Sequence, residues 1–203
     1  HSNAVYQVSI SADGRLAASV GDDNSLRIWD LQSGRCLQQV DEKLRGVRSV
    51  VLTPDGRLAV YGRAYGTVRM LEMPQARPTG TLEGPSWHLQ AVDVTPDGRL
   101  LISGGAHGVV QIWDVDTERH LHSPVGHTAH VNAVCIAADG ALALSAGDDR
   151  TVRVWETAHG SCLHALEGSR REVKTVCVTP DGKTALSAGV DGKLWLWEPE
   201  SGR

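Results

Sequence analysis

Residues 126–155 read GHTAHVNAVCIAADGALALSAGDDRTVRVW. A short apolar run at 131–136 ends in Asp139-Gly140, a turn signal, because glycine tolerates positive φ and aspartate can accept a hydrogen bond from nearby backbone. Alternating apolar residues at 142–146 and again at 152–154 predict two further strands. A fourth strand is expected near 162–166. The stretch therefore predicts a unit of four short antiparallel strands.

The same unit recurs along the whole chain at an interval of 42 residues. Asp-Gly stands at 13–14, 55–56, 97–98, 139–140 and 181–182. An aromatic residue or leucine keeps the same step: Trp29, Leu71, Trp113, Trp155 and Trp197. So do two positions expected in the core: Val8, Val50, Val92, Val134 and Val176 in the first strand, and Ile28, Met70, Ile112, Val154 and Leu196 in the third. Such a period is typical of repeat proteins, in which neighbouring units bury each other's apolar faces.

Composition narrows the classes of function. The net charge of −4 and pI of about 6.1 give no basic field, so no nucleic acid is expected as a partner. Apolar runs fall far short of the roughly 20 residues that span a membrane, so no membrane partner is expected. The four cysteines show no metal-ligand spacing and are expected to be buried or half-buried thiols in a reducing cytoplasm.

Particular dipeptides give the chain a family resemblance. Gly126-His127 opens a repeat, and Trp-Asp closes the third strand at Trp29-Asp30 and Trp113-Asp114. Trp155-Glu156 and Trp197-Glu198 are acidic variants. In these features the whole chain resembles the WD40-repeat β-propellers. The resemblance implies an all-β propeller of five four-stranded antiparallel blades.

The resemblance also implies a buried hydrogen-bonded tetrad of His, Ser or Thr, Asp and Trp in each blade. Two blades keep all four residues: His1, Ser19, Asp23 and Trp29, and His127, Ser145, Asp149 and Trp155. The third blade has Pro85 and His107 in the His and Asp positions, and the fifth has Ser169 in the His position. The second has lost all four residues and is expected to be the least stable: Lys43, Tyr61, Tyr65 and Leu71.

Blade boundaries are expected at 1–42, 43–84, 85–126, 127–168 and 169–203, the last without its fourth strand. The chain starts one residue after a repeat-opening glycine would stand. We therefore expect a partial array of a larger propeller. A self-contained five-bladed ring and an open array completed by oligomerisation are the alternatives.

Partners of the family commonly dock on the narrow face, near the start of the first strand and the loop joining the second and third strands. Residues mapped there vary between blades while core positions do not, which favours binding. The candidate protein-binding residues are Tyr6, Asp22, Arg48, Trp87, His88, Gln90, His130, Asn132, Asp148, Glu172 and Lys174.

The leading interpretation is a non-enzymatic module that binds a protein or peptide, with no cofactor, metal or catalytic residue. No nucleophile–base pair, phosphate loop or converging ligand set is evident, which disfavours an enzyme with a central-channel site. Tracts such as Val94-Thr95-Pro96-Asp97-Gly98 are similar to bacterial WD40 arrays fused to signalling ATPases or kinases, which would place an effector domain in the same longer chain. A structural subunit assembling through blade edges is the other alternative.

Overall fold

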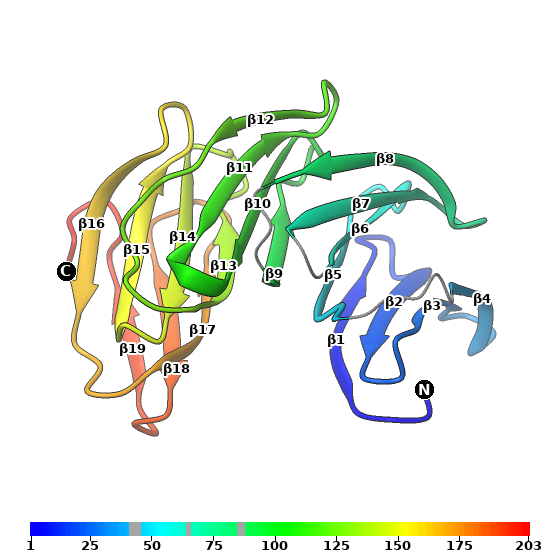
Figure 1. The fold of residues 1–203 in the computed structure, drawn as a ribbon, viewed down its shortest axis with the longest axis horizontal. Helices are drawn as coiled ribbons and strands as arrows, with labels where there is room; N and C mark the ends of the chain where they lie inside the picture. Colours follow the sequence, from blue (N-terminus) through cyan, green and yellow to red (C-terminus); the bar gives the residue numbers. More distant parts are fainter. Residues whose placement is uncertain (41–45, 64–65, 85–87) are drawn as a thin grey trace. The chain divides into compact units, whose positions relative to one another are not determined.

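The computed structural model describes residues 1–40, 46–63, 66–84 and 88–203. In these residues the chain is all-β, with nineteen strands in five antiparallel sheets and one 3₁₀ turn, η1 (Ala106–Gly108). Each sheet is a meander in which successive strands pair (Figure 1). The chain divides into two compact units, His1–Val92 and Asp93–Arg203, and the boundary falls inside β9. The expected all-β fold of WD40 type is confirmed.

The first unit holds two four-stranded sheets and the start of β9. The first sheet consists of β1 (Val5–Ile10), β2 (Leu16–Gly21), β3 (Leu26–Asp30) and β4 (Arg35–Val40). The second consists of β5 (Ser49–Leu52), β6 (Leu58–Gly62), β7 (Thr67–Glu72) and β8 (Arg77–Glu83).

The second unit holds the other three sheets. The third consists of β9 (Leu89–Val94), β10 (Leu100–Gly105), β11 (Val110–Asp114) and β12 (Arg119–His122). The fourth consists of β13 (Val131–Ile136), β14 (Leu142–Gly147), β15 (Thr151–Glu156) and β16 (Ser161–Glu167). The fifth has three strands, β17 (Val173–Val178), β18 (Ala185–Gly189) and β19 (Leu194–Trp197).

The Asp-Gly dipeptides form the turn between the first two strands of each sheet. Gly14 adopts φ 68°, a region that side chains disfavour. The Asp13 carboxylate accepts hydrogen bonds from the Arg15 N–H (3.0 Å) and the Ser11 hydroxyl (2.7 Å). Asp97 and Asp181 make the same pair of contacts in the third and fifth sheets. The repeated dipeptide thus specifies one turn geometry throughout.

Side chains of the first strand link each sheet to the next. Within the first unit, the Ser9 hydroxyl accepts a hydrogen bond from the Leu52 N–H (2.9 Å), and the Ser49 hydroxyl accepts one from the Val92 N–H (2.9 Å). Within the second unit, Asp93 accepts one from the Ile136 N–H (3.0 Å). Apolar side chains from adjacent sheets also pack together, as in the cluster of Val20, Ile28, Val50 and Tyr61 in the first unit. Neighbouring sheets are therefore held by both apolar packing and specific hydrogen bonds.

Two positions expected in the core are exposed in the terminal sheets. Val8 is 56% exposed and Leu196 is 71% exposed, whereas their counterparts Val50 and Val154 are fully buried. The sequence pattern identified the apolar face correctly but could not show whether a neighbouring sheet covers it. Among the described residues, the first sheet packs against the second, and the fifth packs against the fourth.

One smaller expectation, about the cysteines, is also corrected. Cys36, Cys162 and Cys177 are exposed, and Cys135 alone is buried. The first two lie on the outermost strands β4 and β16, which have a neighbour on one side only.

Candidate functional site

The two ends of each sheet carry different loops, because successive strands run antiparallel. One end of each sheet carries the segment that leads into the first strand and the turn between the second and third strands; this end is called the tetrad end. The other end, with the turns between strands one and two and strands three and four, is called the hairpin end. The candidate site residues map to the tetrad end, at repeat-equivalent positions in each sheet.

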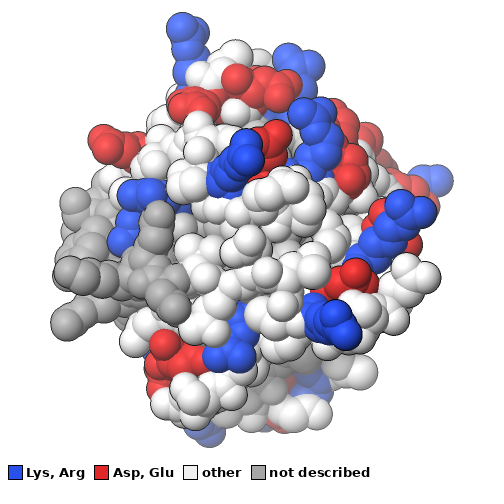
Figure 2. Space-filling model, turned by 90° about the vertical axis from the view of Figure 1, so that its right-hand side faces the viewer, with Lys and Arg blue, Asp and Glu red and all other residues white. Residues whose placement is uncertain are grey.

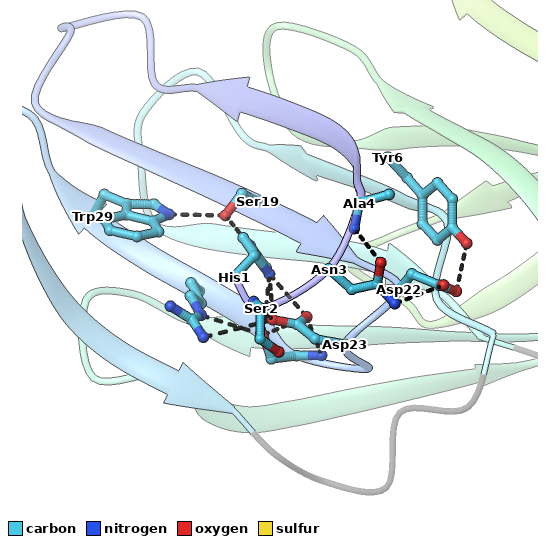
Figure 3. A network of polar contacts seen from close by, with 11 residues as sticks. His1, Ser2, Asn3, Ala4, Tyr6, Ser19, Asp22, Asp23 and Trp29 are labelled. Carbon is cyan, nitrogen blue, oxygen red and sulfur yellow. Dashed lines mark hydrogen bonds and ion pairs between the residues drawn. The ribbon is translucent and has the colours of Figure 1, made fainter.

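In the first sheet, a hydrogen-bonded chain joins the residues of the predicted tetrad (Figure 3). The Trp29 indole N–H donates to the Ser19 hydroxyl (2.8 Å), which also lies 2.7 Å from His1 Nε2. His1 Nδ1 lies 2.9 Å from the Asp23 carboxylate. Asp23 in turn accepts the Ser2 N–H (2.9 Å). These hydrogen bonds thus hold the segment before β1 against β2 and β3.

The fourth sheet has the same chain with shorter contacts. The Trp155 indole N–H donates to Ser145 (2.7 Å), and His127 Nε2 lies 2.6 Å from the same hydroxyl. His127 Nδ1 lies 2.8 Å from Asp149, which also accepts hydrogen bonds from the Thr151 hydroxyl. Ser145 and Trp155 are fully buried. Every polar group of this buried chain has a partner, which is the condition under which such a network stabilises a fold.

Opposing effects set the pKa values in this network. Burial acts to raise the pKa of Asp149, but the His127 imidazole and the hydrogen bonds from Thr151 and the Thr128 N–H hold it below its ordinary value. Burial lowers the pKa of His127, against the pull of the Asp149 carboxylate. Asp149 is therefore charged at neutral pH, with His127 as its hydrogen-bond partner.

The remaining sheets keep parts of the chain. Trp113 donates to Ser103 (3.1 Å) in the third sheet, and Trp197 donates to Ser187 (2.9 Å) in the fifth. Ser169, in the His position, donates to Asp191 (3.1 Å). In the second sheet Tyr61 and Leu71 fill the Ser and Trp positions as fully buried members of an apolar cluster, whereas Lys43 and Tyr65 lie outside the described residues.

The residue four places after the tetrad Asp makes a further contact to it. In the two complete tetrads this residue is an arginine: Arg27 lies 3.5 Å from Asp23, and Arg153 lies 4.0 Å from Asp149. In the fifth sheet Trp195 takes the position, and its indole N–H donates to Asp191 (3.2 Å) while its ring stacks on Trp197 at 5.8 Å. The unusual Trp195 therefore replaces an arginine as a donor to the same carboxylate.

Just outside the tetrad of the first sheet lies an exposed network of predicted binding residues (Figure 3). The Tyr6 hydroxyl donates to Asp22 (2.6 Å), a contact that raises the pKa of Tyr6. Asn3 donates to the other Asp22 oxygen (3.2 Å). Arg48, from the second sheet, lies 4.9 Å from the centre of the Tyr6 ring. Three predicted residues from two sheets are thus brought together around one carboxylate.

Repeat-equivalent residues form a second network between the fourth and fifth sheets. Asp148 accepts hydrogen bonds from Asn132 (2.7 Å) and from Lys174 of the fifth sheet (2.5 Å). Burial acts to raise the pKa of Asp148, but these two contacts hold it below its ordinary value. His130 adds positive charge nearby when protonated and stacks on His107 at 6.2 Å. Asp148, Asn132 and Lys174 occupy the positions that Asp22, Tyr6 and Arg48 occupy in the first unit.

Glu172 makes its contacts elsewhere: it pairs with its neighbour Arg171 at 3.8 Å, and its carbonyl accepts the Val190 N–H. Gln90 is half-buried in β9, His88 is exposed, and Trp87 lies outside the described residues.

One member of these networks, Asn3, was not among the candidates of the sequence analysis, because it does not stand at a repeat position mapped to the binding face. His107 was noted only as the residue in the Asp position of the third tetrad, and not as a neighbour of His130. His107 adopts φ 61° in η1, a conformation that no sequence signal announced.

Among the described residues, no group of three or more His, Cys, Asp or Glu side chains is placed to hold a metal ion. No helix found in that part of the chain is long and apolar enough to cross a membrane. On the face drawn in Figure 2, Lys and Arg side chains lie among Asp and Glu side chains and not in a patch of one sign.

Comparison with known proteins agrees with this geometry. The family described as WD domain, G-beta repeat matches residues 1–30, 76–114, 118–156 and 160–198. The unmatched stretch covers most of the second sheet, which lacks the tetrad. A segment of 39 residues is 49% identical to small ribosomal subunit protein RACK1 of Candida albicans (strain SC5314 / ATCC MYA-2876), covering 19% of this chain and 12% of that protein. The chain thus matches only a small part of that relative.

Proposed function

The chain belongs to the WD40-repeat family, and on that premise we propose that it is a non-catalytic binding module whose tetrad end docks a protein or peptide partner. We propose one binding surface in each unit: the Asp22 network with Tyr6 and Arg48 in the first, and the Asp148 network with Asn132 and Lys174 in the second. These residues would supply the specific contacts, and the tetrads beneath them the rigidity.

One observation carries the proposal. The same three repeat positions form an acid–cation network in both units, each bridging two adjacent sheets, although the residues differ. The first network is exposed, and in the second Lys174 is exposed while Asp148 and Asn132 are half-buried. Asn132 also donates to the Val173 carbonyl of the fifth sheet (2.9 Å), whereas Tyr6, Arg48 and Lys174 are exposed and lie outside the apolar clusters. Exposed tyrosine and arginine over a rigid scaffold are residues that often anchor interfaces. A constant arrangement with variable residues favours recognition.

A double substitution tests the proposal. Arg48→Ala with His130→Ala should weaken binding of a captured partner about tenfold or more, because hot-spot truncations cost more than about 1 kcal/mol each. Arg57→Ala with Lys183→Ala, both exposed at the hairpin end, is the matched control. Circular dichroism should show unchanged melting for both pairs. If the partner binds the tetrad-end variant as tightly as the wild type, the partner uses another surface.

Context belongs to the same proposal. We infer that the module works in the cytoplasm, which four free thiols support. An effector domain in a longer chain, such as a signalling ATPase or kinase, would be a partner held in cis. A P-loop or kinase signature in a longer reading frame would support this arrangement.

A second candidate function is a structural subunit that assembles through its terminal sheets. The observation in its favour is apolar: Leu194 is 73% exposed and Leu196 71%, while the repeat-equivalent Val152 and Val154 of the fourth sheet are fully buried. Val8 and Ile10 of β1 are also exposed. Apolar surface of this kind marks interfaces. Light scattering over a range of concentrations tests it, because a mass that stays monomeric would contradict assembly.

A further inference from the structure

The hairpin end of the first unit contains a groove that plays no part in the proposed function. It lies between the first and second sheets and has a volume of about 380 Å³. Its lining combines three carboxylates with an apolar wall: Asp13, Asp30, Asp55, Leu16, Leu37 and Pro74. Arg15 is the one cation among the lining residues, so three negative charges against one positive charge leave a net charge of −2.

Comparison with the second unit shows why space remains here. Between the third and fourth sheets, His122 donates through Nε2 to the Ala158 carbonyl (2.8 Å). Between the fourth and fifth sheets, His164 makes the same contact to the Glu200 carbonyl (3.1 Å). Each histidine closes the space between the outermost strand of one sheet and the turn that follows the third strand of the next. In the first sheet the equivalent residue is Gln38, and the equivalent carbonyl belongs to Pro74.

A second position changes together with the histidine. Gly160 and Gly202 lie against these rings so closely that a Cβ would come within 2.6 Å of His122 and of His164, respectively. The second sheet has Ala76 at this position, with φ 52°. Its Cβ would occupy the space that the imidazole needs. The pair Gln38 and Ala76 therefore keeps open a groove that His and Gly close elsewhere.

The charge of the groove is also less compensated than at an equivalent place. In the third sheet Arg99 lies 3.8 Å from Asp114. In the first sheet the equivalent Arg15 pairs instead with Asp13, at 3.7 Å. Asp30, the counterpart of Asp114, accepts the Gln32 and Ser33 N–H groups through one oxygen, and no cation among the described residues pairs with it.

We propose that this groove binds a long cationic side chain, arginine or lysine, presented by a peptide or protein partner. The aliphatic part of such a side chain packs on Leu37 and Pro74, and its charged end lies among the carboxylates of Asp30 and Asp55. Charge complementarity and the apolar wall together select this occupant over an acidic or a purely apolar one. The site is independent of the tetrad end, because it lies at the opposite end of the same strands.

Peptide titrations followed by nuclear magnetic resonance test the proposal. The probes are acetyl-Ala-Gly-Arg-Gly-Ala-amide and the same peptide with Lys, norleucine or Glu at the central position. We expect the Arg or Lys peptide to shift the amide signals of Leu37 and Gly56 but not that of Gly98, the equivalent of Gly56 in the third sheet. Equal shifts with the norleucine or Glu peptide, or no shift with either cationic peptide, would overturn the proposal.

Two substitutions sharpen the test. Asp30→Asn keeps the acceptor for the Gln32 and Ser33 N–H groups, so the turn persists while binding weakens about threefold or more. The matched control Asp114→Asn should leave binding unchanged. The double substitution Gln38→His with Ala76→Gly should close the groove and abolish the shifts at an unchanged or higher melting temperature. Binding that survives both groove variants would show that the peptide lies elsewhere.

Discussion

Asp93→Asn should stabilise the protein at neutral pH, a result opposite to the usual effect of removing a hydrogen-bonded side chain. Asp93 lies on β9 and accepts the Ile136 N–H at 3.0 Å. Burial raises its pKa from 3.8 to about 6, and the hydrogen bonds from the Ile136 and Val94 N–H groups only partly oppose this. Asparagine keeps an acceptor oxygen for Ile136 without the buried charge.

The magnitude follows from linkage. Because the folded-state pKa is raised, the folded protein binds the proton more tightly than the unfolded chain does between pH 3.8 and about 6. The contribution of Asp93 to the free energy of unfolding is therefore greatest below pH 4 and falls as the pH rises to about 6. At about 1.4 kcal/mol per pKa unit, the charged carboxylate costs about 3 kcal/mol at pH 7.

Urea unfolding at pH 4.5 and pH 7.5 measures the effect. The difference in unfolding free energy between Asp93→Asn and the wild type should be about 1 kcal/mol at pH 4.5, where the carboxyl is already ionised in most unfolded molecules. It should rise to about 3 kcal/mol in favour of the variant at pH 7.5. Asp116→Asn, at an exposed carboxylate of the same sheet, should show no such difference. A variant less stable than the wild type at pH 7.5 would refute the reasoning.

Further predictions concern the tetrads. Asp149→Ala should lower the unfolding free energy by about 2 kcal/mol or more, because it leaves His127 buried without its carboxylate partner; an unchanged melting temperature would contradict the assigned network. Ser169→His should raise the stability of the fifth sheet by about 1 kcal/mol by restoring the missing imidazole beside Asp191, as hydrogen exchange at the β18 amides would show. A loss of protection there would mean that the ring does not fit.

Much of the fold could be predicted from the sequence, because the signals were local and repeated. Asp-Gly turns such as Asp13-Gly14, and alternating apolar residues, each act within a few residues, so the 42-residue step located every sheet. The repeat also placed Tyr6, Asp22 and Arg48, and likewise Asn132, Asp148 and Lys174, at equivalent positions, but it did not mark Asn3. Contacts between sheets were harder to predict: the pairing of Tyr6 with Arg48 depends on how adjacent sheets are placed, and no single repeat encodes that.

The sequence could not show which apolar faces are covered, as the exposed Val8 and Leu196 demonstrate. For the same reason, the sequence did not predict the groove at the hairpin end of the first unit. Gln38 and Ala76 are unremarkable in isolation and acquire meaning only beside His122 and Gly160, once the contact between those two is seen. The absence of the closing histidine and glycine becomes visible only when equivalent positions of the folded repeats are compared.

The hydrogen bonds between the first strands of neighbouring sheets determine where a destabilising substitution has its effect. The second sheet has no tetrad of its own, but hydrogen bonds tie it to both neighbouring sheets. Two N–H groups of β5 donate to the side chains of Gln7 (3.3 Å) and Ser9 (2.9 Å) in the first sheet, and the Ser49 hydroxyl accepts the Val92 N–H. The second sheet can therefore stay folded without a tetrad, because its contacts with the neighbouring sheets stabilise it. Repeat proteins in general are stabilised by such nearest-neighbour contacts. Substitutions in β1 should then first increase the local opening of β5, which belongs to the neighbouring sheet.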